Sequence, residues 1–428
     1  MRLHVSIEYN HKNLWGVLMA NQNLTNAKKA KKDEFYTRWE EIEKEVNAYI
    51  EYNKDVFKGK IILLPADDPF ESNFFKYFAV HFNDYGLKKL IATSYDSSPV
   101  VNQQLSLFGD DEEERAGKAY KIELTHVEDF NHDGVFNIQD VERFLESEKI
   151  NLNSSKGSKV LNYLNGDSEF VPGDFRSKEV TKLRNEADII ITNPPFSLFR
   201  EFMKWVNPLN KKVLVIGNLN AITYKEIFPL IKNNELWLGA TNFNTGMYFN
   251  VPDNFEYKKS YHFIREIDGQ KVNRVPGVCW FTNLDHGRRH QPLSLMSMAD
   301  NIKFSKHNDI KEWGYMEYAN YDAIEVPHTD AIPNDYNGKM GVPVTFLDKF
   351  NPDQFEIIGC GDYKGQYGSD YLGIKEIGEE WLKKYREQGG KGHYTANMNS
   401  PVYYLPDGTA KPTFKRIFVK IKNSVEKD

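Results

Sequence analysis

Short apolar runs, separated by stretches with helical spacing, recur along the first two thirds of the chain. Six of them have the length and composition of buried strands: residues 60–65, 89–94, 187–192, 212–217, 235–238 and 277–282. Apolar side chains at helical spacing predict helices over about residues 36–52 and 74–82. This alternation of strands and helices predicts an α/β fold with a doubly wound, Rossmann-like sheet.

The pattern changes in the last third, where short segments rich in glycine, asparagine and aromatic residues replace it. A separate α+β region is therefore expected over residues 285–428. Residues 1–32 are polar and end in a run of lysines, which we interpret as a basic, solvated arm. The main domain then covers residues 33–284, with an acidic insert at 97–149.

Composition argues against a membrane-spanning, secreted or disulfide-rich protein. The chain lacks any run of about 18 apolar residues, which argues against a membrane-spanning helix, and its N-terminus is too polar for a signal peptide. Only Cys279 and Cys360 are present, so we expect a reducing, cytoplasmic location and no disulfide scaffold. The net charge of −6 arises in one segment, because Asp110 to Glu148 holds 13 acidic residues against four basic ones. The rest of the chain is slightly basic, which leaves nucleic acid open as a partner.

The apolar run that ends at Thr192 is followed by Asn193-Pro194-Pro195-Phe196. Because two prolines cannot continue a strand, this segment is expected at the carboxyl edge of the sheet, where such sheets bind ligands. The side-chain oxygen of Asn193 and the carbonyl of Pro194 are two close acceptors, which match the two N–H donors of an exocyclic amino group. Phe196 offers a flat face on which a planar base can stack.

These four residues predict a site that holds an amino-bearing base while its nitrogen is alkylated. The alternative is a turn in which Asn193 caps the following helix and Phe196 fills the core.

A methyl donor such as S-adenosylmethionine needs an acidic partner, an apolar slot and a polar contact. Asp67 and Asp68 follow the first strand, at the usual cofactor corner of a doubly wound sheet. Phe70 can line the slot, while Ser72-Asn73 can cap the next helix or bind the donor's carboxylate. Asp174 is a candidate partner for the donor's adenine amino group. Each acid alone is equally explained as a solvated loop carboxylate.

Several segments together resemble the EcoRI-type family of adenine-specific DNA methyltransferases, over most of the chain. They are Asp33-Glu34-Phe35-Tyr36-Thr37, Asp67-Asp68-Pro69-Phe70-Glu71-Ser72-Asn73-Phe74-Phe75, Gly173-Asp174-Phe175-Arg176, Asn193-Pro194-Pro195-Phe196-Ser197-Leu198-Phe199-Arg200 and Gly341-Val342-Pro343-Val344-Thr345-Phe346-Leu347. The resemblance implies S-adenosylmethionine as the methyl donor. It also implies the N6 amino group of adenine in double-stranded DNA as the acceptor.

The resemblance also assigns contacts to the donor. It implies that Phe35-Tyr36-Thr37 contacts the methionine end, that the loop Asp67-Asp68-Pro69-Phe70 holds the donor, and that Asp174 binds its adenine ring. The chain departs from methyltransferases in general at this loop, which replaces a glycine-rich one.

The expected reaction requires the adenine to leave the duplex, because a stacked base cannot enter the pocket. Asn193 and Pro194 then accept its two N–H groups, so that the nitrogen lone pair is directed at the methyl group. Two alternatives use the same motif or fold: an RNA or protein-glutamine amino-methyltransferase, and a non-catalytic DNA-binding protein. A cognate restriction endonuclease is a further candidate partner.

The acidic insert contains a loop with the spacing of an EF-hand. Its oxygen ligands would be Asp129, Asn131, Asp133, Asn137 and Asp140, with Gly134 at the sharp turn. This pattern predicts a structural calcium site. The alternative is an acidic surface turn whose side chains cap a helix that begins at Val141.

The last third also contains two groups of cations that are candidates for DNA contact. They are Lys383, Lys384, Arg386 and Lys391 near a glycine-rich loop, and Lys415 and Arg416 on a predicted strand at 411–420. For each group an ordinary solvated surface is the alternative.

Overall fold

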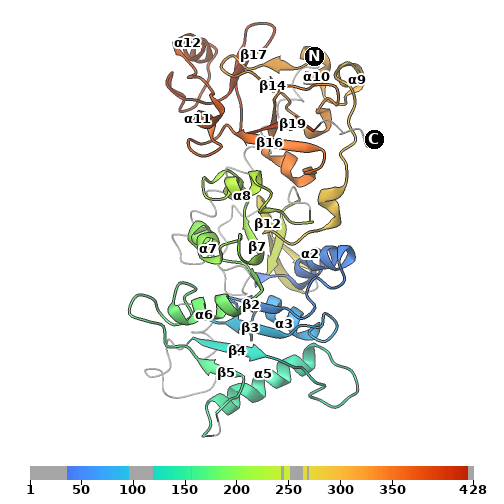
Figure 1. Cartoon of the computed structure of the whole chain (residues 1–428), viewed down its shortest axis with the longest axis vertical. Helices are drawn as coiled ribbons and strands as arrows, with labels where there is room; N and C mark the ends of the chain where they lie inside the picture. The colour runs from blue at the N-terminus through green and yellow to red at the C-terminus, as the bar shows by residue number, and fades with distance from the viewer. Residues whose placement is uncertain are drawn as a thin grey trace. The chain divides into compact units, whose positions relative to one another are not determined.

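The computed structural model describes residues 36–95, 119–155, 157–241, 245–250, 264–267 and 269–422. The expected basic arm, Phe35 and residues 97–118 of the insert lie outside these ranges. Contacts divide the chain into two compact units (Figure 1). The first unit runs to Leu219 and resumes over Gly239–His286, and the second comprises Asn220–Leu238 and Gly287 onward. The sequence placed the boundary at 284/285 and did not separate residues 220–238 from the first domain.

A mixed sheet forms the centre of the first unit. Its strands there are β2 (Ile61–Leu64), β3 (Lys89–Thr93), β4 (Tyr120–Leu124), β5 (Leu161–Tyr163), β6 (Ile189–Thr192), β7 (Lys212–Asn218) and β12 (Val278–Thr282), in the order β5-β4-β3-β2-β6-β7-β12. The four strands β3, β2, β6 and β7 are parallel, whereas β4, β5 and β12 pair antiparallel with their neighbours. The chain order reverses between β2 and β6, which makes that point the topological switch of the sheet.

Helices cover both faces of this sheet, as the alternating side chains of β2 show. Ile62 and Leu64 join the larger apolar cluster, to which the first set of helices contributes: α2 (Trp39–Tyr52), α3 (Asn73–Val80) and α5 (Ile138–Leu152). Ile61 and Leu63 point the other way and pack with Leu183 of α6 (Lys178–Glu186) and with Trp205 of α7 (Phe199–Val206). The expected α/β fold with a sheet buried on both faces is therefore confirmed.

In its described part the acidic insert contributes to the core of the main domain, because β4 is a strand of the central sheet (Figure 1) and α5 packs on α3. One local expectation was wrong. Tyr36 and Thr37 do not begin the first helix, since they form strand β1 (Tyr36–Thr37). This strand belongs to a small antiparallel sheet with β9 (Met247–Asn250), β11 (Gln270–Val275) and β10 (Ile264–Ile267), in the order β1-β9-β11-β10.

The second unit is built on a five-stranded sheet. Its strands are β13 (Met316–Glu317), β14 (Ile324–Glu325), β15 (Met340–Pro343), β19 (Arg416–Ile421) and β16 (Phe355–Cys360), in the order β13-β14-β15-β19-β16. A hairpin of β17 (Val402–Tyr404) and β18 (Ala410–Pro412) stands beside it. The unit also contains the short strand β8 (Trp237–Leu238). The helices are α8 (Phe228–Lys232), α9 (Met298–Phe304), α10 (Asn308–Trp313), α11 (Ser369–Leu372) and α12 (Glu379–Glu387).

The strand expected at residues 411–420 is interrupted. β18 ends at Pro412 and β19 begins at Arg416, so residues 413–415 form a turn. Across the described ranges, no helix combines the length and the apolar character needed to span a bilayer.

Candidate functional site

Hydrogen bonds join the carboxyl ends of three parallel strands at the switch point. The hydroxyl of Thr192, the last residue of β6, donates to the carbonyl of Pro65 after β2, over 3.0 Å. The next residue, Ala66, donates its N–H to the hydroxyl of Thr93 at the end of β3, also over 3.0 Å. Ala66 has a φ of 59°, a left-handed conformation that turns the chain sharply away from the strand. The ends of β2, β3 and β6 therefore form one corner.

The segment Asn193–Phe196 leaves the sheet at this corner, as expected. Pro194 is buried, whereas Asn193 and Phe196 are half-buried. The ring of Phe196 packs partly against the apolar cluster under the sheet and begins a single 3-10 turn. The N-cap of α7 is Leu198, which makes no side-chain capping bond, so Asn193 is not the cap of this helix. The capping alternative is therefore wrong.

The loop after β2 is ordered by its own acidic residues. Asp67 accepts a hydrogen bond from the hydroxyl of Ser72 over 2.9 Å. Asp68 accepts one from the backbone N–H of Phe70 over 2.9 Å and another from the hydroxyl of Tyr120 over 2.6 Å. Burial raises the pKa of Asp68, and these two hydrogen bonds act against the shift. The sequence did not predict the role of Tyr120, because β4 was assigned to the acidic insert.

The N-terminus of α3 and strand β1 meet beside this loop. Ser72 is the N-cap of α3, and its hydroxyl oxygen accepts from the backbone N–H groups of Phe74 and Phe75. The side-chain amide of Asn73 donates to the carbonyl of Thr37 over 2.9 Å. The segments that the sequence assigned to the donor, around residues 37 and 67–70, are thus brought together.

Thr37 carries a buried polar atom for which the described part of the chain offers no partner. The residue is 5 % exposed, and its Oγ1 has no hydrogen-bond partner among the described residues. A buried hydroxyl without a partner is unfavourable, so native proteins rarely keep one unless a ligand or water completes it. The position fits a ligand that brings a polar group to β1.

Asp174 also lies at the corner, because Gly173 allows a very close approach to β3. A Cβ at Gly173 would lie 2.0 Å from the carbonyl oxygen of Ser94, and its φ of +81° also favours glycine. The buried carboxylate of Asp174 accepts bonds from Arg176 over 2.8 and 3.0 Å. This hydrogen bond raises the pKa of Arg176, which also pairs with Glu201. The expected contact of Asp174 with an adenine ring would have to share the carboxylate with Arg176.

A family model described as "Adenine-specific methyltransferase EcoRI" matches residues 23–422. The chain belongs to this family. It is 40 % identical over 338 residues to Type II methyltransferase M.EcoRI of Escherichia coli, which covers 79 % of this chain and 89 % of the relative. Type II methyltransferase M.MpnI of Mycoplasma pneumoniae is 35 % identical over 336 residues, or 78 % of this chain and 84 % of the relative. No solved structure gives a significant match. The chain is therefore an adenine-specific methyltransferase.

The calcium prediction is not supported in this member of the EcoRI methyltransferase family. Within the described ranges no group of three or more His, Cys, Asp or Glu residues is arranged to hold a metal ion. Backbone N–H groups of the loop itself donate to the oxygens of the predicted ligands Asp129, Asn131, Asp133, Asn137 and Asp140. These bonds make the segment a self-contained acidic turn.

The same turn starts helix α5. Asn137 is its N-cap, and Asp140 completes a capping box, so the helix begins at Ile138 and not at Val141. Burial opposes ionisation of Asp140, but backbone N–H groups of Asn137 and Asn131 lower its pKa. A cavity of about 480 Å³ lies beside this turn, lined mainly by apolar side chains such as Phe130, Phe136 and Phe144. It is distinct from the strand-end corner, whose residues do not line it.

The cations on and after α12 differ in what they already bind. Lys383 is exposed and lies 4.0 Å from Glu387, and the Lys384 ammonium lies 4.9 Å from the centre of the Tyr404 ring. Arg386 instead orders the following loop, since its guanidinium donates to the carbonyls of Gly390, Gly392 and Tyr394. The Lys391 side chain of that loop is exposed.

Lys415 and Arg416 are committed to the interior of the second unit. The Lys415 ammonium donates to Asn220 over 3.1 Å and to Thr223 over 3.0 Å. Arg416 pairs with Glu325 and has a side-chain exposure of 12 %. Both cations therefore make stabilising contacts within the second unit.

Proposed function

We propose that this chain transfers a methyl group from S-adenosylmethionine to N6 of an adenine that has rotated out of double-stranded DNA. One observation carries the proposal: Asn193–Phe196 emerges at the switch point, where the Thr192–Pro65 hydrogen bond ties it to the acidic loop after β2. A base held by Asn193 therefore has a candidate donor pocket directly beside it.

The residues around the corner fit the donor. S-adenosylmethionine, when bound, supplies a methyl group activated by the positive charge on its sulfur. The orphaned Oγ1 of Thr37 and the capped N-terminus of α3 suit a polar, carboxylate-bearing end. Asp67 and Asp68 supply negative charge near it, while Phe70, half-buried against Tyr120, offers an apolar wall. Pro69 is buried and keeps the loop in one conformation.

The acceptor side uses the residues after β6. The Oδ1 of Asn193 and the carbonyl of Pro194 accept the two N–H groups of the adenine amino group, and so fix the direction of its lone pair. Because Pro195 has no N–H, no backbone donor competes at that point. Phe196 stacks on the base, since its ring is only partly buried against the core.

Contact with DNA phosphates is assigned to the exposed lysines of the second unit, Lys383, Lys384 and Lys391. Arg386, Lys415 and Arg416 are left out of this set, because their charged groups already bond to the protein. A cognate restriction endonuclease is proposed as the biological partner, which host survival with and without this gene would test.

Replacing Asn193 by Ala tests the catalytic assignment. We expect the rate of methyl transfer to fall by at least about a hundredfold, because one of two aligned acceptors is lost. Donor binding, measured by calorimetric titration with S-adenosylmethionine, should stay within about twofold of wild type. Asn162→Ala, at an exposed asparagine of β5 in the same sheet, is the matched control and should retain activity. Parallel loss of donor binding in Asn193→Ala would refute the assignment.

The substrate class is tested with labelled donor offered to unmethylated duplex DNA, RNA and protein. Label in DNA as N6-methyladenine is the expected result. Label only in RNA or protein would establish an amino-methyltransferase of the alternative kind, and label in none of them would indicate a non-catalytic DNA-binding protein.

A further inference from the structure

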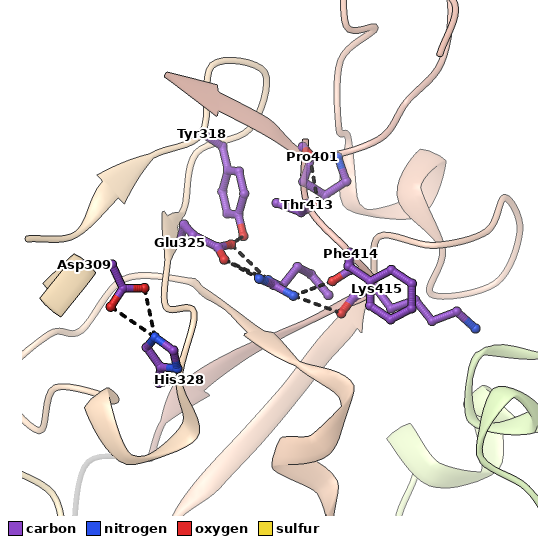
Figure 2. Close-up of polar contacts among 9 residues, drawn as sticks. Asp309, Tyr318, Glu325, His328, Pro401, Thr413, Phe414 and Lys415 are labelled. Carbon is purple, nitrogen blue, oxygen red and sulfur yellow. Dashed lines mark hydrogen bonds and ion pairs between the residues drawn. The ribbon is translucent and has the colours of Figure 1, made fainter. Parts of the chain in front are cut away.

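Phe414 lies at the tip of the turn between β18 and β19, and its side chain is 56 % exposed. Figure 2 shows the ring next to Lys415, to one side of the polar side chains around Glu325. An exposed phenylalanine contributes little to the stability of its own fold. The turn is nevertheless held more firmly than an ordinary surface turn, as its hydrogen bonds show.

One side of the turn is held by a buried ion pair. The Nη1 of Arg416 donates to the carbonyls of Phe414 and Lys415 (Figure 2). The Nε of the same guanidinium donates to both carboxylate oxygens of Glu325, over 2.9 and 3.0 Å. Glu325 is 2 % exposed and also accepts a bond from the Tyr318 hydroxyl. Glu325 thereby orients the Arg416 guanidinium, which in turn holds the backbone around Phe414.

The other contacts fix the residues on either side. The hydroxyl of Thr413 donates to the carbonyl of Pro401 over 2.9 Å. The Lys415 ammonium is anchored to Asn220 and Thr223, and the backbone of Lys415 has a φ of +22°, a strained value for a residue with a Cβ. Such strain persists only where the surroundings impose it, which is frequent at functional sites.

The chain also makes room for this network. A Cβ at Gly341 of β15 would lie 2.1 Å from the hydroxyl oxygen of Tyr318, so a larger residue would displace the tyrosine from Glu325. Gly341 opens the segment Gly341–Leu347, one of those that resemble the methyltransferase family.

The turn continues a hairpin on which helix α12 packs. Trp381 of α12 forms an apolar cluster with Val402 and Ala410 of the hairpin, and the side chain of Gln388 accepts a bond from the backbone of Ala410. Lys383 and Lys384, proposed above to contact phosphates, project from this helix. The two lysines and the aromatic turn are thus built on one rigid element, from which the lysine ammonium groups can reach phosphates.

We infer that Phe414 is a base-contacting residue, which stacks on or between the bases of the DNA bound for methylation. A fixed aromatic ring loses little conformational freedom on binding, and stacking on a base favours a planar side chain over an aliphatic one. The inference rests on the proposed function. The polar groups of the turn already bond to the protein, so the ring is what the turn offers to a partner.

The test compares three substitutions at this position with a matched control. The control is Phe304→Ala, at an equally exposed phenylalanine of α9, whose side chain is 62 % exposed. The probe is a duplex that carries the methylation target mapped by sequencing plasmid DNA from an expressing host. We expect Phe414→Ala and Phe414→Leu to weaken duplex binding about tenfold or more, whereas Phe414→Trp retains it. Affinity for S-adenosylmethionine and the melting temperature should match wild type in all four variants.

Salt dependence separates base contact from charge contact. The slope of log affinity against log salt should be unchanged in Phe414→Ala, because no phosphate contact is lost, but shallower in Lys391→Ala. Duplex binding by Phe414→Ala equal to wild type would overturn the inference, as would equal losses in Phe414→Ala and Phe304→Ala or undiminished duplex binding in Phe414→Leu.

A change in oligomeric state in Phe414→Ala, measured by light scattering, would assign the ring to contact between copies instead. Failure of the proposed function is distinguishable, because the wild-type chain would then leave the duplex unmethylated.

Discussion

Most polar side chains at the strand-end corner already have partners within the protein. The carboxylate of Asp68 accepts hydrogen bonds from Phe70 and Tyr120, which order its own loop, and the carboxylate of Asp174 bonds to Arg176. Thr37 differs from both, because its buried hydroxyl has no partner among the described residues. An unsatisfied polar atom weakens the protein in the absence of ligand, so the side chain is better explained by what it binds.

Thr37→Val tests this explanation, because it should lower donor affinity without lowering the stability of the donor-free protein. Donor affinity should fall about two- to tenfold, the loss expected for one hydrogen bond. The melting temperature without donor should stay equal or rise, because the change removes an unsatisfied hydroxyl and keeps the shape. Thr37→Ser, which retains the hydroxyl, is the control and should keep most of the donor affinity. A valine variant that binds the donor as well as wild type would remove Thr37 from the site.

At the scale of elements, α10 and the 3-10 turn η6 (Thr329–Ala331) are joined by two histidine–aspartate pairs. His307 pairs with Asp330 and His328 with Asp309, each over 2.8 Å (Figure 2 shows the second pair). The two imidazole rings stack with their centres 3.6 Å apart and their planes at 4°. The two carboxylates thus hold the stacked rings in place, one from α10 and one from η6.

The pair of His307 with Asp330 makes stability depend on pH. Burial acts to raise the pKa of Asp330, but hydrogen bonds from Lys306 and His307 outweigh burial and lower this pKa to about 2. Since an unfolded aspartate titrates near 3.9, the folded state binds fewer protons between these values. The stabilising contribution is present above about pH 4 and disappears as the pH falls to about 2.

Asp330→Asn should therefore destabilise the protein at neutral pH by no more than about 1 kcal/mol, because the pair is partly exposed. It should also flatten the loss of stability between about pH 4 and 2, as measured by urea unfolding at each pH. Glu312→Gln, at an exposed position of α10, is the control and should follow the wild-type profile. An unchanged acid profile in Asp330→Asn would show that the pair contributes nothing to stability.

At the scale of the whole molecule, the second unit is discontinuous in sequence. Residues 220–238 belong to it, although the rest of the unit begins at Gly287. Side chains of this segment pack against the rest of the unit. The guanidinium of Arg289 lies 3.7 Å from the centre of the Trp237 ring, and Phe228 packs edge-on against Tyr363. A break in the chain at the apparent domain boundary would remove these contacts.

A fragment of residues 287–428 is therefore expected not to fold by itself, which a flat thermal melt by circular dichroism and rapid proteolysis would reveal. Fusing residues 220–238 to its N-terminus through a flexible linker should restore a cooperative transition. Cooperative unfolding of the shorter fragment would show that the segment is dispensable.

Several features followed from the sequence because they depend on local physics. Isoleucine-rich runs at residues 60–65 and 187–192 are too short and apolar for anything but buried strands, and the prolines after Asn193 end the second one. The type of fold, the edge that carries the motif and the acidic loop at Asp67 and Asp68 were predicted in this way. β4 was missed as part of the sheet, because Tyr120–Leu124 alternates polar and apolar residues inside an acidic segment.

The sequence by itself determined which residue types the chemistry has available: an asparagine and a proline carbonyl for an amino group, aromatic faces for a base, and acids beside a helix N-terminus. Only the tertiary structure decided which of them remain available to a ligand. Lys415, Arg416 and the loop acids from Asp129 to Asp140 bond within the protein. By contrast, the buried hydroxyl of Thr37 has no partner in the described part of the chain, and Phe414 is exposed on a fixed turn. The reason is physical, since hydrogen-bond partners and solvent exposure depend on residues far apart in the chain, and no local pattern records them.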